Sequence, residues 1–202
     1  MVLLFAIVLG LLIALTTGGS FRNAAGVRIR YLPLLIGALF VQILIFTEIL
    51  GTTDFAHDYG RYIYIGTLFV TLAVMLLNFH IPGMPIIALG AFLNALVITA
   101  NGGKMPSPES ALRRAGLLER VREGERGEGV LTNSTVVNDD TNLRFLGDVI
   151  PLPGLNVISI GDIVLGIGAI IAIVVVLRRT PEPEPEPGTG TRDSGFGAVE
   201  RD

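Results

Sequence analysis

Five long apolar runs constrain this chain more than any other feature of its sequence. Half of its 202 residues are hydrophobic and 16% are charged, whereas about a quarter of the residues in a soluble domain are charged. A helix needs about 20 apolar residues to cross the hydrocarbon core of a membrane, and its backbone groups must be hydrogen-bonded within the segment. The sequence therefore predicts an all-α membrane protein, a bundle of about five transmembrane helices. The runs cover about residues 2–17, 31–50, 62–77, 85–100 and 159–177.

The runs divide the chain into four parts. Residues 1–100 hold four predicted transmembrane helices, residues 101–158 form an extramembrane segment, and residues 159–179 form the fifth helix. Residues 180–202 begin with alternating Pro and Glu. Because such a composition cannot bury enough apolar surface to fold, we predict a disordered tail. The first run lacks a basic start and an A-x-A cleavage site, so we expect a retained helix and not a removable signal peptide.

The basic residues of the short loops predict the orientation in the membrane. Residues 18–30 contain three arginines and no acid, and the last run ends on Arg178 and Arg179, whereas residues 51–61 contain two aspartates and one arginine. Loops rich in Lys and Arg stay in the cytoplasm. We therefore expect a multi-pass protein of the bacterial cell membrane, with its N-terminus outside and its C-terminus cytoplasmic. The 101–158 segment then lies at the outer face. Its seven basic residues are balanced by eight acidic residues, and long segments follow the rule weakly.

Residues 107–126 of this segment predict a short amphipathic helix. Pro108 suits the first turn of a helix, because its missing N–H needs no partner there. Apolar residues then recur at helical spacing, and their face would cover the mouth of the bundle or lie on the membrane surface. Residues 130–142 begin with a strand-like stretch and end in turn formers. The apolar face consists of Ala111, Leu112, Ala115, Leu118 and Val121.

Small residues spaced four apart predict close packing between the helices, because apolar side chains gain little by leaving lipid for protein. The amides Gln42 and Asn94 lie inside the predicted spans and are candidates for hydrogen bonds between helices. The small residues are Ala6, Gly10 and Ala14, then Ala91 and Ala95, then Gly168 and Ala172.

A polar cluster is predicted at the outer end of the bundle. Asn101 and two glycines end the fourth run, and Lys104 follows at once. Asp148, Asp162 and Glu48 reach the same face in the predicted topology. Ionisable groups at a membrane tend to be paired, so we expect Lys104 to form an ion pair with Asp148 or Asp162. The cluster is either a structural clasp for the outer segment or a ligand site.

Three short motifs accompany this cluster: Asn101-Gly102-Gly103-Lys104-Met105-Pro106, Leu146-Gly147-Asp148 and Ser159-Ile160-Gly161-Asp162. Together they resemble a bacterial multi-pass membrane protein family of unknown function, over residues 1 to about 179. The resemblance implies no activity, substrate or cofactor, so no catalytic role carries over. It adds weight to the idea that these residues form one site or one clasp. The last motif also fits a capping box, in which Ser159 and Asp162 start the final helix.

The sequence assigns no catalytic residue, because it contains no G-x-x-x-x-G-K-[ST], H-E-x-x-H or G-x-S-x-G motif. The chain has no cysteine, which excludes thiolate ligands, and Asp54, His57 and Asp58 are too few ligands for a metal site. We expect no metal and no cofactor.

Three functions remain open at this point. The first is a non-catalytic accessory or scaffold component of the membrane. Its partners would be the lipid bilayer and either another membrane protein or a second copy of the chain, and no nucleic acid. The second is a membrane-embedded enzyme or lipid-handling protein that uses the polar cluster. The third is a small transporter, for which Gln42 and Asn94 offer few polar groups along the spans.

Overall fold

The computed structural model describes residues 2–128 and 130–179, and these residues are mostly helical. The predicted tail at residues 180–202 lies outside the described residues. The elements in chain order are α1 (Val2–Thr16), η1 (Phe21–Gly26), α2 (Leu32–Ile45), α3 (Asp54–Leu77), α4 (Met84–Ala100), β1 (Met105–Ser107), α5 (Glu109–Ala115), α6 (Leu118–Glu125), β2 (Ser134–Val136), η2 (Arg144–Leu146), β3 (Ile150–Leu152), β4 (Asn156–Ile158) and α7 (Ile160–Arg178), where η marks a 3-10 helix.

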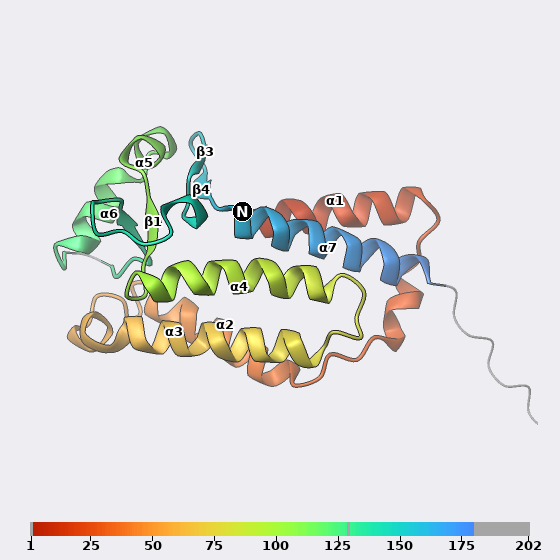
Figure 1. Cartoon of the computed structure of the whole chain (residues 1–202). Helices are drawn as coiled ribbons and strands as arrows, with labels where there is room; N and C mark the ends of the chain where they lie inside the picture. The colour runs from red at the N-terminus through yellow and green to blue at the C-terminus, as the bar shows by residue number, and fades with distance from the viewer. Residues whose placement is uncertain (1, 129, 180–202) are drawn as a thin grey trace, which may run out of the picture.

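Five long helices lie side by side, and a smaller cap covers one end of them (Figure 1). Packing contacts join α1 to α7, α7 to α4, α4 to α3, and α3 to α2. The last helix along the chain therefore lies between the first helix and the fourth long one. The cap consists of residues 101–158 and lies where α4 ends and α7 begins. We call the opposite end of the helices the loop end.

Two of these helices, α3 and α7, are long and apolar enough to cross a membrane. The helix α3 starts well before the predicted position at Tyr62, because Thr53 caps it by accepting a hydrogen bond from the Ala56 N–H at 3.3 Å. Asp54 in its first turn also favours the positive helix end. The helix α2 ends at Ile45, short of its apolar run. The apolar helices α1, α2 and α4 have 15, 14 and 17 residues.

The cap contains short strands as well as helices, so the expectation of an all-α fold is wrong for this part of the chain. Strands β1 and β2 pair in parallel, with Met105 opposite Ser134. Strands β3 and β4 form an antiparallel hairpin, with Ile150 opposite Ile158. Each strand has only three residues, too short a stretch for an alternating apolar pattern to stand out in the sequence.

The predicted amphipathic helix is in fact two short helices, α5 and α6. Gly116 ends α5 with a left-handed φ of 74°, and Ser107, the first residue of the predicted range, belongs to β1. The five residues of the predicted apolar face are nevertheless all buried, at 7% exposure or less. They pack in one cluster with Val157 of β4. The prediction of this face is confirmed, although a turn interrupts the helix.

Glycines allow α4 and α7 to pack at backbone distance. A Cβ atom at Gly90 would lie 2.5 Å from both the Gly161 carbonyl oxygen and the Leu165 nitrogen. A Cβ atom at Gly168 would lie 2.6 Å from the Ile87 nitrogen. Any larger residue would push the two helices apart, so the contact between α4 and α7 depends on glycine.

Predicted contacts between helices are also present on α1 and α2. Ala6, Gly10 and Ala14 are all buried on a helix that packs against α7, which confirms the predicted small-residue packing for α1. Gln42 of α2 donates a hydrogen bond from Nε2 to Thr67 Oγ1 of α3 at 3.0 Å. The predicted role of Gln42 between helices is therefore confirmed.

Asparagines fasten the loops at the loop end. Asn78 is fully buried, and its Oδ1 accepts a hydrogen bond from the Arg30 N–H at 2.7 Å. Its Nδ2 donates to the Arg30 carbonyl oxygen at 3.0 Å. Asn23 Nδ2 donates to the Leu177 carbonyl oxygen at 2.6 Å. These bonds hold the first loop against the end of α7 and against the turn between α3 and α4.

Candidate functional site

Asp162 lies in a closed hydrogen-bond network at the start of α7. Its N–H donates to Ser159 Oγ at 2.9 Å, and the Ser159 N–H donates to Asp162 Oδ2 at 3.1 Å. This confirms the predicted capping box. Asn94 of α4 donates from Nδ2 to Asp162 Oδ1 at 2.9 Å, and Ser159 Oγ donates to Asn94 Oδ1 at 2.9 Å. Each carboxylate oxygen therefore has a donor, and the network joins α4 to α7.

Asp148 lies where the cap meets the bundle, within range of the Asp162 charge. Its N–H donates to the Pro106 carbonyl oxygen at 2.9 Å, beside β1. Its side chain is partly buried. Burial, and secondly the negative charge of Asp162, raise the pKa of the Asp148 carboxyl from 3.8 to about 7. A carboxyl with this pKa gains and loses a proton near neutral pH, as a general acid–base group does.

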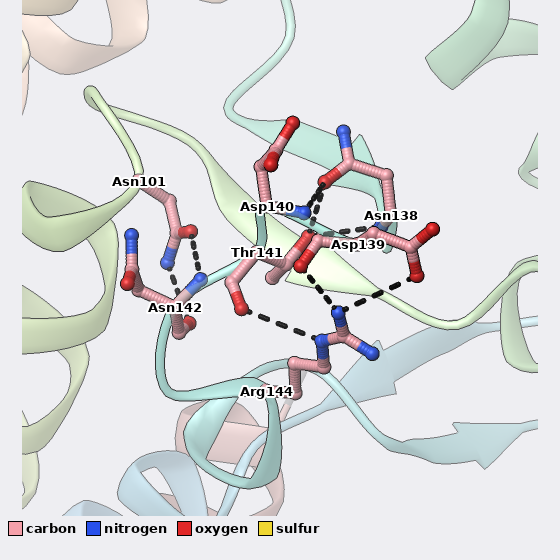
Figure 2. Close-up of polar contacts among 7 residues, drawn as sticks. All are labelled: Asn101, Asn138, Asp139, Asp140, Thr141, Asn142 and Arg144. Carbon is pink, nitrogen blue, oxygen red and sulfur yellow. Dashed lines mark hydrogen bonds and ion pairs between the residues drawn. The ribbon is translucent and has the colours of Figure 1, made fainter.

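Asn101 joins the end of α4 to the cap (Figure 2). Its Nδ2 donates to the Asn142 carbonyl oxygen at 2.9 Å, and its Oδ1 accepts from the Asn142 N–H at 2.9 Å. Asn101 Nδ2 also donates to the Val97 carbonyl oxygen at 2.8 Å. Asn142 Nδ2 in turn donates to the Ala100 carbonyl oxygen at 3.2 Å. We call this reciprocal arrangement the asparagine clasp.

Arg144 orders the turn that presents Asn142 to the clasp (Figure 2). Its Nη2 donates to the Asp139 carbonyl oxygen at 2.7 Å, and its Nε donates to the Thr141 carbonyl oxygen at 3.4 Å. Leu143, which lies between Asn142 and Arg144, has a φ of 51°. This conformation costs a non-glycine residue about 1–3 kcal/mol, so the surrounding contacts must hold it.

Lys104 does not form the predicted ion pair. Within the described residues, no ion pair joins it to Asp148 or Asp162. After α4 the chain runs toward α3, where Gly103 packs against Arg61. This path explains why the predicted ion pair is absent. Lys104 therefore borders a hollow beside Arg61 and not the start of α7.

Glu48 also lies apart from the other predicted cluster residues. It is exposed beyond the end of α2 and borders a hollow of about 620 Å³ that Arg120 and Glu123 also line. In the described part of the chain, no three His, Cys, Asp or Glu side chains gather closely enough to hold a metal ion. The predicted cluster is therefore divided, with Asp148 near Asp162 and the remaining members elsewhere.

Two further polar groups belong to this region but give no signal in the sequence. Tyr64 of α3 is 5% exposed, and its ring packs edge-on against Phe46 with centroids 4.8 Å apart. Its hydroxyl accepts a hydrogen bond from Asn133 Nδ2 at 3.4 Å. Ser107 is fully buried, and its Oγ has no hydrogen-bond partner among the described residues. A tyrosine near the end of an apolar run indicates only a membrane interface, and a serine before proline indicates only a helix start.

A family model matches residues 26–174, well over half of the chain. The chain belongs to DUF5317, a family of unknown function. The DUF5317 match begins at the last residue of η1, ends within α7 and includes the positions of all three sequence motifs. The helix α1 lies outside it. No curated protein and no solved structure matches the chain. The match to a family of unknown function is confirmed, whereas the three motifs as its signature and its bacterial membrane character stay predictions.

Proposed function

We propose that this DUF5317 protein is a multi-pass membrane protein whose five long helices cross the membrane and whose cap is a non-catalytic platform for a protein partner. The observation that carries the proposal is the exposure of large apolar side chains on every long helix. Five examples, one from each helix, are between 48% and 59% exposed. Soluble monomers rarely expose apolar patches larger than a few hundred Å², so lipid is the environment that suits this surface. The examples are Leu4, Phe40, Phe69, Leu89 and Ile167.

The three shorter apolar helices are compatible with this proposal. The 15 residues of α1 extend about 22 Å at 1.5 Å per residue, against about 30 Å of hydrocarbon. A bilayer thins locally around a short apolar helix at a modest free-energy cost.

Charge at the two ends of the bundle supports an orientation with the loop end in the cytoplasm. Among the described residues, the loop end contains five arginines and no Asp or Glu. The cap end contains both signs of charge. Because arginines in short loops remain on the cytoplasmic side, the cap would face outward. The five arginines are Arg22, Arg28, Arg30, Arg178 and Arg179.

Several polar side chains form hydrogen bonds with other groups of the protein, which favours a scaffold over an enzyme. Asp162 is held by Ser159 and Asn94, and Asn101 is held by Asn142. These groups fasten the cap and the helices to each other. Hydrogen bonds that hold the cap in one position suit a platform for a partner.

The membrane part of the proposal can be tested with single cysteines, since the natural chain has none. Ser110→Cys places an exposed thiol on the cap, and Arg22→Cys places one at the loop end. In intact cells, a membrane-impermeant maleimide should label Ser110→Cys only, and both variants should react after lysis. Equal labelling in intact cells would contradict the proposed topology.

The scaffold part can be tested by purification in mild detergent. We expect the chain to elute with a protein partner or as an oligomer, measured by light scattering coupled to size-exclusion chromatography. Asn101→Ala should weaken this association by loosening the cap, whereas His80→Ala, exposed at the loop end, should leave it unchanged. A monodisperse monomer without a partner would argue against a scaffold.

Asp148 favours a second candidate function, a membrane-embedded enzyme or lipid-handling protein. Its raised pKa, near neutrality, suits proton transfer at the boundary between cap and bundle. The test is to incubate the purified chain with bacterial phospholipids and to compare the lipids by mass spectrometry. A change made by the natural chain and abolished in Asp148→Asn would support this function. Identical profiles for the two proteins would count against it.

A further inference from the structure

A basic hollow is bordered by α3, the turn after α4, the end of α6, the segment after α2 and the loop before β2. The helix α3 contributes His57 and Arg61, the turn after α4 contributes Lys104, and the end of α6 with its following loop contributes Gly124 and Gly127. Its volume is about 190 Å³. Pockets for drug-sized ligands have volumes of about 300–1,000 Å³, so this one suits a single small group.

The charge around the hollow is unbalanced. Within the described residues, neither Arg61 nor Lys104 forms an ion pair with a carboxylate. The acid that borders the hollow, Glu125, has its Oε1 engaged by Thr135 Oγ1 at 2.6 Å and by the Val136 N–H at 2.9 Å. These neutral donors leave the negative charge of Glu125 in place, so two cations and one carboxylate border the hollow. The excess positive charge attracts an anion.

The glycines of the Asn-Gly-Gly-Lys motif create this arrangement. Gly102 and Gly103 have φ values of 65° and 89°, which other residues rarely adopt. A Cβ atom at Gly103 would lie 2.9 Å from Arg61 Cβ. Glycine therefore lets the chain pass directly against α3, and Lys104 follows beside Arg61. The Arg61 guanidinium lies 5.4 Å from the centroid of the Tyr62 ring, within the distance of a cation–π contact.

We propose that this hollow binds a phosphate group, with Arg61 and Lys104 as its charged ligands and His57 as a further donor. Arginine matches the oxygens of phosphate with two parallel N–H donors, and lysine adds a point charge. Phe46 and Leu131 border the same hollow and provide an apolar edge. The phosphate belongs either to a soluble phosphate compound or to the headgroup of a phospholipid. Only the lipid source depends on the proposed membrane position.

The first experiment measures binding of inorganic phosphate to the full chain in mild detergent by isothermal titration calorimetry, with chloride at equal ionic strength as the reference. Arg61→Gln and Lys104→Gln should each weaken binding roughly tenfold, as expected for loss of one charge-assisted contact. Arg61→Lys should keep part of the affinity. The matched control is Arg114→Gln, which removes an exposed positive charge from α5, outside the hollow, and should bind like the natural chain. Circular dichroism at 222 nm checks that each variant is folded.

The second experiment tests the lipid source by native mass spectrometry. The chain is mixed with equal amounts of phosphatidylglycerol and diacylglycerol, which share their acyl chains and differ in the phosphate headgroup. Retention of phosphatidylglycerol alone, reduced in Arg61→Gln and Lys104→Gln, assigns the hollow to lipid phosphate. Binding of inorganic phosphate with no preference between the two lipids assigns it to a soluble compound.

The proposal is overturned if neither phosphate source binds. It is also overturned if Arg114→Gln weakens binding as much as the two hollow variants, because the attraction would then be general. Either result would leave the scaffold proposal untouched, since that proposal depends on the topology and on the co-purified partner.

Discussion

Asp148→Asn should make the protein more stable at alkaline pH and change it little under acidic conditions. The natural carboxyl has its pKa raised from 3.8 to about 7 by burial and by the Asp162 charge. A raised carboxyl pKa means that the folded state holds the proton more tightly than the unfolded state. Stability therefore falls as pH rises from about 4 to about 7, and above pH 7 the full penalty remains. Asparagine has nearly the same shape and carries no charge at any pH, so it avoids this penalty.

The size of the effect follows from the same pKa. A value of about 7 in place of 3.8 corresponds to about 4 kcal/mol between the two protonation states. Because the carboxyl is only partly buried, water relieves some of this cost, and we expect a gain of about 1–2 kcal/mol for Asp148→Asn at pH 8. That gain corresponds to several degrees in melting temperature, at roughly 2–4 °C per kcal/mol for a chain of this size.

The assay is thermal unfolding in mild detergent, followed by circular dichroism at 222 nm between pH 4 and pH 9. The control is Asp140→Asn, which neutralises an exposed aspartate of the same segment. The melting temperature of Asp148→Asn should rise above that of the natural chain as pH increases, and Asp140→Asn should follow the natural chain throughout. A lower melting temperature for Asp148→Asn at pH 8, or a difference independent of pH, would refute the reasoning. The first result would mean that the folded state stabilises the ionised carboxylate, and the second that titration of Asp148 does not cause the difference.

Two further substitutions test the contact between α4 and α7 and the contact between α4 and the cap. Gly161→Ala adds a methyl group that overlaps the Asn94 side-chain oxygen, and such overpacking costs about 1–3 kcal/mol. Its melting temperature should fall, whereas Gly37→Ala, with open space around it, should not lower it. Asn101→Ala removes the clasp to Asn142 and should cost about 1–3 kcal/mol. Trypsin should then cleave the cap faster while the helices stay protected, and an unchanged cleavage rate would show that the clasp does not hold the cap.

The predictions agree best with the structure where they depend on residues that are close together in the sequence. The apolar runs place all five long helices, because the composition of such a run is a property of neighbouring residues. The capping box of Ser159 and Asp162 spans only four positions and forms as predicted. The apolar face of residues 111–121 is buried as predicted, since helical spacing survives the turn at Gly116.

The site could be predicted only in part. Asn94 and Asp162 are 68 residues apart along the chain, and their bond requires α7 to pack beside α4. The sequence does not reveal this neighbour relation, because every apolar helix face is equally able to meet another. The same holds for the short strands of the cap and for the buried Ser107.

By itself, the sequence determined which segments are helical, where the charges gather and where the last helix begins, because each depends on residues close along the chain. The tertiary structure decided the lateral order of the helices, the pKa of Asp148 and the position of Lys104. Each of these depends on segments that are distant in sequence. Among the described residues Lys104 forms no ion pair with Asp148 and borders a hollow that Arg61 also lines, because the glycine before it packs against α3. Backbone contact between distant segments, and not the attraction of opposite charges, therefore sets the position of this lysine.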